Sequence, residues 1–146
     1  MERRDFIKDC GMLCLGVVGM AAVLQGCTSA NYFAKTQVDG GKIAVKKSEF
    51  TFIDGDKTKQ RKYVLVRLGQ SEFPICLYKH SETEYSALLM YCTHKGCELL
   101  PQGEYLVCPC HGSEFSNKGK VLNPPAEQDL KQYATSTDDE NIYIQL

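Results

Sequence analysis

The sequence has almost no excess of charge of either sign. It carries 17 Lys and Arg residues against 18 Asp and Glu residues, for a formal net charge of -1. Nucleic-acid binding depends on clustered positive charge that neutralises phosphates. The composition therefore gives no electrostatic reason to expect a nucleic-acid partner.

Beyond residue 26 the chain also lacks a long amphipathic helical repeat. Short apolar or alternating runs lie instead between turn residues, which is the pattern of β-strands. So many short runs in about 105 residues predict an all-β fold, a small antiparallel sandwich or barrel-like domain. The expected strands are Lys42–Val45, Phe50–Ile53, Tyr63–Leu68, Pro74–Tyr78, Glu84–Tyr91, Glu104–Val107, Lys120–Leu122 and Asn141–Gln145.

Histidine is scarce and cysteine is abundant, with 3 His and 8 Cys in 146 residues. This length suits one modest domain, and 43% hydrophobic residues are enough to build a core. So many cysteines in so small a chain need a redox, metal or disulfide explanation. An intracellular housekeeping domain is therefore not expected.

The first 26 residues have the pattern of an export signal. A charged start, Arg3-Arg4-Asp5-Phe6-Ile7-Lys8, precedes an uncharged stretch from Cys10 to Gly26. The arginine pair resembles a twin-arginine signal, which exports proteins already folded around a cofactor, although Glu2 stands where Ser or Thr is preferred. The alternative is an ordinary charged helix start.

The end of this segment, Leu24-Gln25-Gly26-Cys27, resembles a bacterial lipobox, in which the cysteine is diacylated and becomes the new N-terminus. Two acyl chains anchor a protein stably in a bilayer. The alternative keeps residues 10–26 as an uncleaved helix, at the short limit for a membrane span. Either way, we expect a domain at residues 42–146 that is tethered outside the cytoplasm, on the periplasmic side, through a linker at residues 27–41.

Two short segments hold most of the remaining cysteines and two of the three histidines. They are Cys92-Thr93-His94-Lys95-Gly96-Cys97 and Cys108-Pro109-Cys110-His111-Gly112-Ser113. Each offers a thiol and an imidazole as metal ligands and holds one further cysteine. The stretch between His94 and Cys108 is long enough for a hairpin that brings the segments together.

The same residues allow three alternatives. A structural zinc site also accepts two cysteines and two histidines, but its cysteines are usually two to four residues apart. Haem attachment and a thioredoxin-like redox pair both need two residues between the cysteines, whereas Cys108 and Cys110 have one between them. A framework of disulfide bonds alone leaves the two histidines unexplained.

Over about residues 90–115 the two segments resemble those of the Rieske proteins. In that family two cysteines and two histidines hold one 2Fe–2S cluster. The resemblance implies a Rieske-type sandwich with a two-loop cluster-binding subdomain. It also implies that the cluster ligands are Cys92 and Cys108 on one iron, and His94 and His111 on the other.

The resemblance further assigns roles beside the ligands. Cys97 and Cys110 are expected to form the disulfide bond that joins the two loops in the respiratory branch. Ser113 stands where the family's serine donates a hydrogen bond to a bridging sulfide. Phe115 replaces a tyrosine that bonds a ligand cysteine in quinol-oxidising members, and Lys95 replaces an apolar residue beside the quinone pocket. Loss of the tyrosine hydroxyl at Phe115 is expected to lower the potential, and the charged Lys95 is a poor fit to an apolar quinol site.

Three other features carry less weight. Asn123-Pro124-Pro125-Ala126 resembles the proline loop that covers the cluster from a third side, without the family's leading glycine. Cys76 lies in an apolar run and is expected to be a buried small hydrophobic residue. His80 has no cysteine nearby and is expected at the surface.

Two functions remain open. The first is a membrane-tethered Rieske protein that carries single electrons in an extracytoplasmic redox or respiratory chain, with redox proteins as partners. The second is the Rieske subunit of a quinol–cytochrome c-type or arsenite-type oxidoreductase complex. The chain is too short for the added catalytic domain of a ring-hydroxylating oxygenase, and it shows no acid–base pair or nucleophile apart from the expected ligands.

Overall fold

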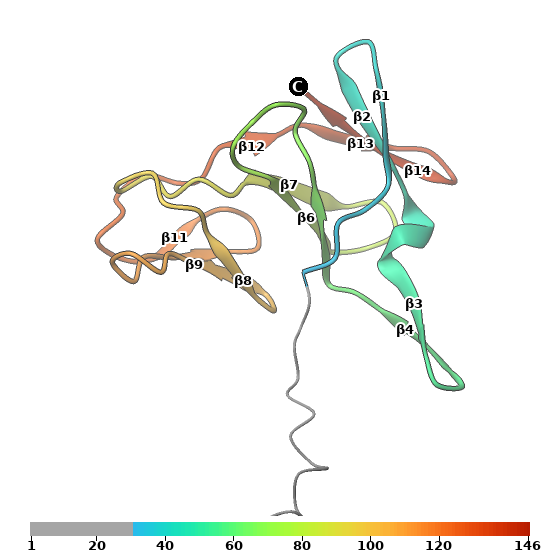
Figure 1. Cartoon of the computed structure of the whole chain (residues 1–146), viewed down its shortest axis with the longest axis horizontal. Coiled ribbons are helices and arrows are strands. Elements are labelled where there is room, and N and C mark those ends of the chain that lie inside the picture. The colour runs from blue at the N-terminus through green and yellow to red at the C-terminus, as the bar shows by residue number, and fades with distance from the viewer. Residues whose placement is uncertain (1–30) are drawn as a thin grey trace, which may run out of the picture. The chain divides into compact units, whose positions relative to one another are not determined.

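A computed structural model describes residues 31–146, which form an all-β fold as the sequence predicts. The strands make three antiparallel four-stranded sheets and one two-stranded hairpin (Figure 1). A single short 3-10 turn, Lys47–Phe50, interrupts them within this part of the chain. No helix among residues 31–146 is long and apolar enough to cross a membrane. The expected export signal and the lipobox at Cys27 lie outside the described residues.

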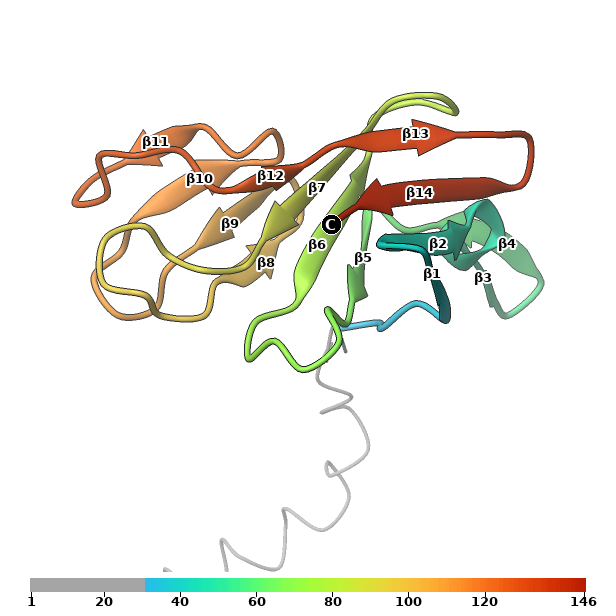
Figure 2. The ribbon, with the colours of Figure 1, turned by 90° about the horizontal axis from the view of Figure 1, so that it is seen from above.

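The central sheet is buried on both faces. Its strands, in the order β12-β7-β6-β5, are β5 (Tyr63–Val66), β6 (Ile75–Lys79), β7 (Tyr85–Leu89) and β12 (Gln132–Tyr133). Val64 and Val66 pack into one hydrophobic cluster, whereas Leu65 packs into another. Strands that are covered on both sides give continuous apolar runs instead of alternating ones. Figure 2 shows these strands between two outer sheets.

One outer sheet follows the regular alternation of a half-buried strand. In the order β1-β2-β14-β13, it contains β1 (Thr36–Asp39), β2 (Lys42–Lys46), β13 (Thr135–Thr137) and β14 (Asn141–Gln145). Ile43 and Val45 of β2 are fully buried, as are Ile142 and Ile144 of β14. These alternate residues lie in the same hydrophobic cluster as Val64, so one face of this outer sheet packs against the central sheet.

The domain starts earlier than the sequence indicated. Residues 36–39, which we assigned to the linker, form β1 and pair with β2 across Gly40 and Gly41. Both glycines have positive φ, 54° and 81°, as a two-residue hairpin turn requires. Because β1 lies at the edge of the sheet with mostly exposed side chains, no apolar period marks it.

Residues 31–35, which we call the N-terminal strap, are also held on the domain. The Leu65 backbone donates its N–H to the Tyr32 carbonyl and accepts the Ala34 N–H, both at 2.8 Å. The strap thereby covers the outer edge of β5. The Arg61 guanidinium lies 3.9 Å from the centre of the Tyr32 ring, a cation–π contact that adds a side-chain attachment.

The other outer sheet carries the two cysteine–histidine segments. In the order β11-β10-β9-β8, its strands are β8 (Leu100–Gln102), β9 (Tyr105–Val107), β10 (Glu114–Ser116) and β11 (Val121–Asn123). The remaining strands, β3 (Thr51–Asp54) and β4 (Lys57–Gln60), form an exposed hairpin. Cys92 and Cys108 belong to the second core cluster, together with Leu106 and Phe115. The hydrophobic core therefore fixes one end of each segment.

Candidate metal centre

The first segment, residues 92–97, forms a closed loop that we call loop 1. The Cys92 N–H donates to the Cys97 carbonyl at 2.9 Å, and the Gly96 N–H donates back to the Cys92 carbonyl at 2.8 Å. Gly96 has a φ of 77°, in the left-handed region that glycine adopts without strain. A Cβ at this position would lie 2.8 Å from the Tyr91 hydroxyl oxygen, so the Tyr91 ring packs closely against the loop.

The second segment, residues 108–113, forms loop 2 between β9 and β10 with the same backbone pattern. The Cys108 N–H donates to the Ser113 carbonyl at 2.8 Å, and the Gly112 N–H donates to the Cys108 carbonyl at 3.0 Å. Gly112 has a φ of 79°. Among the described residues, no atom lies within 4 Å of a Cβ built at Gly112, so this loop is less crowded than loop 1.

The four cysteines of the loops divide into a disulfide bond and two free thiols. Cys97 and Cys110 are joined by a disulfide bond, with their Cα atoms 6.5 Å apart, which links loop 1 to loop 2. Cys92 and Cys108 are free and 0% and 2% exposed. The Cys108 sulfur lies within 4.8 Å of both sulfurs of the disulfide. Because the disulfide uses two sulfurs, Cys92 and Cys108 are the loop residues left to supply thiolates.

The two loop histidines lie side by side. The ring centres of His94 and His111 are 4.9 Å apart, and the ring planes meet edge to face at 86°. His94 Nδ1 is buried and finds no hydrogen-bond partner among residues 31–146. A buried polar atom without a partner is costly, and a coordinated metal would satisfy it. The third histidine, His80, is half-buried and bonds instead to Ser86 Oγ at 2.8 Å.

The surroundings of the thiols favour metal binding over a free thiolate. Burial raises the pKa of the Cys92 thiol, the backbone N–H groups of His94 and Lys95 lower it, and the neighbouring Cys108 thiol raises it further. A positive metal ion stabilises coordinating thiolates that burial otherwise disfavours. The two loops thus hold two free thiols and two neighbouring imidazoles, a donor set that fits an iron–sulfur cluster.

Residues 122–128, which we call loop 3, are bonded to both cysteine loops. The Ala126 N–H donates to Ser113 Oγ at 3.0 Å, and Thr93 Oγ1 donates to the Gln128 carbonyl at 2.7 Å. The sequence gives no sign of these bonds, because each uses a backbone group that carries no residue-type signal. Loop 3 contains the expected proline loop and thus holds loops 1 and 2 together.

The residues expected to tune the cluster occupy different environments. Ser113 and Phe115 are fully buried beside loop 2. Lys95 is exposed on loop 1. A buried hydroxyl must be hydrogen-bonded to offset its lost hydration, and Ser113 meets this requirement through Ala126. Phe115 brings no hydroxyl group to this part of the core.

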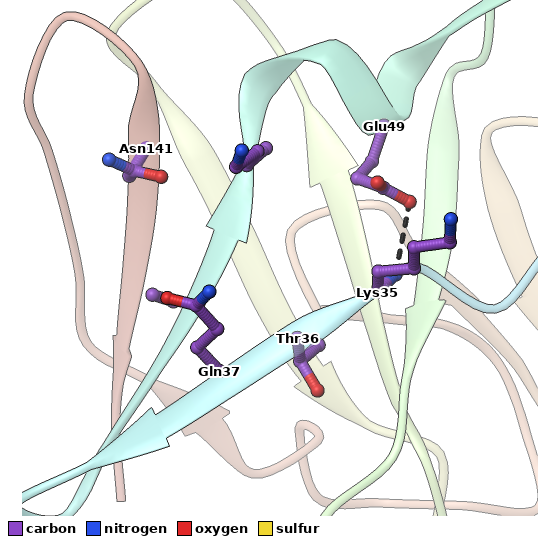
Figure 3. Close-up of a pocket in the computed structure, with 7 residues that line it drawn as sticks. Lys35, Thr36, Gln37, Glu49 and Asn141 are labelled. Carbon is purple, nitrogen blue, oxygen red and sulfur yellow. Dashed lines mark hydrogen bonds between the residues drawn. The ribbon is translucent and has the colours of Figure 1, made fainter.

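A surface pocket lies between β1, β2 and β14 (Figure 3). The Glu49 carboxylate at its rim accepts the backbone N–H of Lys35 at 3.0 Å and the Tyr32 hydroxyl at 2.7 Å. Its lining residues are Lys35, Thr36, Gln37, Ala44, Lys46, Glu49 and Asn141. None of them is a cysteine or a histidine, so the pocket adds no ligand of these types to the candidate metal centre.

Comparison with known proteins identifies one family. The sequence profile described as "Rieske [2Fe-2S] domain" matches residues 34–134. The cytochrome b6-f complex iron-sulfur subunit of Trichodesmium erythraeum (strain IMS101) is 28% identical over 156 residues, covering 99% of this chain and 85% of that protein. The subunit of the same name from Synechococcus sp. (strain JA-3-3Ab) is 43% identical over 54 residues, covering 35% of this chain and 31% of that protein.

A solved structure is similar as well. The cyanobacterial plasma membrane Rieske protein PetC3 from Synechocystis PCC 6803 aligns with a TM-score of 0.52 and 33% sequence identity. The alignment covers 58% of this chain and 87% of that chain. The similarity therefore extends over most of the smaller protein.

Proposed function

The chain belongs to the Rieske 2Fe–2S family, and from that premise we propose that it is a membrane-tethered carrier of single electrons outside the cytoplasm. The cofactor of this domain is one 2Fe–2S cluster, which takes up and releases one electron at a time. The proposal rests on the contact between the His94 and His111 rings, which come from two different loops. Each of these loops begins with a buried free cysteine.

We assign the cluster ligands to these four side chains. Cys92 and Cys108 supply two thiolates from the hydrophobic core, while His94 and His111 supply two imidazoles. Replacing two thiolates by neutral imidazoles makes a cluster less negative and raises its potential, to between about -150 and +300 mV. The exposed position of His111 gives a route for an electron to reach a docked partner.

Three observations support a location outside the cytoplasm. The Cys97–Cys110 disulfide belongs to a class of bond that persists in oxidising compartments. The N-terminal sequence resembles a twin-arginine signal and ends in a lipobox at Cys27. The similar protein PetC3 is named a plasma membrane Rieske protein. We therefore propose an export segment at residues 1–26, with attachment through a lipid on Cys27 or through an uncleaved helix.

Matched cysteine variants test the ligand assignment. Cys92→Ala and Cys108→Ala should abolish the iron and acid-labile sulfide of the purified full-length protein, because each removes a thiolate ligand. Cys76→Ala is the control, since Cys76 is equally buried in the same core cluster and is no proposed ligand. Normal iron and sulfide contents in either ligand variant would contradict the assignment.

Cell fractionation tests the tether. The full chain should sediment with membranes and incorporate radiolabelled palmitate, and Cys27→Ala should abolish the label. A membrane-bound, unlabelled wild-type chain with an intact N-terminus would favour the uncleaved helix. Recovery of the wild-type chain in the soluble fraction would contradict tethering altogether.

A second candidate function is a subunit of a quinol-oxidising complex. It is favoured by the similarity over nearly the whole chain to a subunit named for the cytochrome b6-f complex. Phe115 and the exposed Lys95 weigh against it. The midpoint potential of the cluster, measured at several pH values by a redox titration that is monitored by EPR, distinguishes the two functions. A positive midpoint potential that falls with pH near neutrality supports quinol chemistry, since the electron is then coupled to a proton, whereas a negative and pH-independent midpoint supports the simple carrier.

A further inference from the structure

Loop 3 carries hydrogen bonds to both cysteine loops, so its own attachment affects the proposed cluster site. Its first residues belong to β11, where Asn123 pairs with β10. In its middle, the Ala126 N–H donates to Ser113 Oγ at 3.0 Å. At its end, the Gln128 carbonyl accepts the Thr93 hydroxyl at 2.7 Å. Movement of loop 3 would therefore alter contacts with loops 1 and 2 together.

The next residue, Asp129, closes the loop. One carboxylate oxygen accepts the Val121 backbone N–H at 3.0 Å, and the other accepts Lys120 Nζ at 2.7 Å. Both partners precede loop 3, so the carboxylate joins its two ends. The Lys120 side chain, followed by the Val121 N–H, holds the pKa of the carboxyl below its usual range, and the group is an ionised acceptor at neutral pH.

The contact between Ala126 and Ser113 is buried. Ser113 is 0% exposed and Ala126 is 3% exposed. A serine hydroxyl has one proton to donate, and accepting the Ala126 N–H directs that proton away from loop 3. An accepted hydrogen bond also polarises the hydroxyl and makes it a stronger donor. The place of Ala126 therefore governs both the direction and the strength of the Ser113 donor.

We propose that Asp129 is a positioning residue for the cluster, because it closes loop 3 and so keeps the Ala126 N–H on the Ser113 hydroxyl that tunes the potential. This inference rests on the proposed function. Asp129 lies outside both cysteine–histidine segments, so neither segment identifies it. The Leu130 N–H also bonds the Gly119 carbonyl at 2.9 Å, which holds the chain after the loop independently of Asp129. Substitution of Asp129 therefore loosens loop 3 without unfolding the sheet.

Three variants of the full-length, cluster-loaded protein test the role of Asp129. Asp129→Ala removes both hydrogen bonds and should speed hydrogen exchange at the Ala126 amide about tenfold while lowering the midpoint potential. Asp129→Asn keeps an oxygen for the Val121 N–H and should restore both properties. Lys120→Gln removes only an exposed ion pair, whose side chains are 72% and 46% exposed, and should change neither property.

A combination with Ser113→Ala separates positioning from general stability. Ser113→Ala alone should lower the potential, and adding Asp129→Ala should then lower it no further, although exchange at Ala126 still speeds up. Unchanged exchange at Ala126 in Asp129→Ala would overturn the inference. A potential shift that persists in the Ser113→Ala background would overturn the route through Ser113. Failure of the proposed function would appear separately, as wild-type protein without iron and sulfide.

Discussion

Loops 1 and 2 share a backbone and differ in the order of their side chains. In both, the opening cysteine donates its N–H to the carbonyl five residues later, and a glycine with a φ of 77° or 79° turns the chain. At the third and fourth positions, loop 1 has His94 and Lys95, whereas loop 2 has Cys110 and His111. The shared backbone thus fixes a buried cysteine in each loop. The order of the other residues decides which imidazole meets solvent.

The two loops also differ in how they are supported. Loop 1 packs against the Tyr91 ring at Gly96, and its sixth residue, Cys97, enters the disulfide bond. Loop 2 has open space at Gly112, and its sixth residue is the buried Ser113. The disulfide bond and loop 3 support both loops, so the difference between them is that only loop 1 is also crowded at its glycine, by the Tyr91 ring.

Removal of the disulfide bond should have the largest effect on this pair of loops. The cysteines are 13 residues apart, and closing a segment of similar length contributes about 3 kcal/mol to stability. Cys97→Ala combined with Cys110→Ala should lower the free energy of unfolding by about that amount and speed cluster loss. Denaturation followed by absorbance of the cluster measures both. A double variant as stable as the wild type would show that packing alone holds the loops together.

Alanine at Gly96 or Gly112 should lower the stability of the protein less than loss of the disulfide bond does, and by different amounts in the two loops. Left-handed backbone costs an alanine about 1–2 kcal/mol in either loop. At Gly96 the new Cβ also meets the Tyr91 hydroxyl oxygen, so Gly96→Ala should destabilise the protein more than Gly112→Ala. Thermal denaturation of both variants checks this order. Adding Tyr91→Ala to Gly96→Ala should remove the additional destabilisation at Gly96. Equal losses of thermal stability in Gly96→Ala and Gly112→Ala would contradict the expected difference between the loops.

The smallest expected effect is a change of potential at Phe115, two residues after loop 2. Phe115 is fully buried, and its counterpart two residues after loop 1 is Leu99, so neither provides a hydroxyl. One hydrogen bond contributes about 0.5–1.5 kcal/mol. Phe115→Tyr should therefore raise the midpoint by roughly 20–65 mV. Phe115→Leu is the packing control, and an equal shift in both variants would exclude a hydroxyl effect.

The strands that could be predicted are those whose sequence contains a run of apolar residues. Each of the eight expected strands overlaps an observed one, as Tyr63–Leu68 overlaps β5. The strand β4 was missed because Lys57-Thr58-Lys59-Gln60 is fully exposed and has no apolar period. The strand β8 was missed because it is an edge strand of only three residues with Pro101 at its centre. Backbone pairing alone leaves no mark in the hydrophobic pattern.

The candidate site was predictable to a similar degree. The spacing of cysteines and histidines identified loops 1 and 2, because metal ligands must be particular residue types. The Cys97–Cys110 disulfide was expected from the family resemblance, and it is present. The bonds that attach loop 3, from Ala126 to Ser113 and from Thr93 to Gln128, were not predicted. Each joins segments far apart in the chain through a backbone group that every residue has.

The N-terminal strap limits the length of chain that could serve as a free tether. Because Tyr32 is bonded to β5 and covered by Arg61, the free part of any tether ends there. Cys27 precedes Tyr32 by five residues, and five extended residues span at most about 18 Å. Under the proposed attachment at residue 27, these five residues set the greatest reach of the tether, and an electron partner would have to come to the membrane surface to meet the domain.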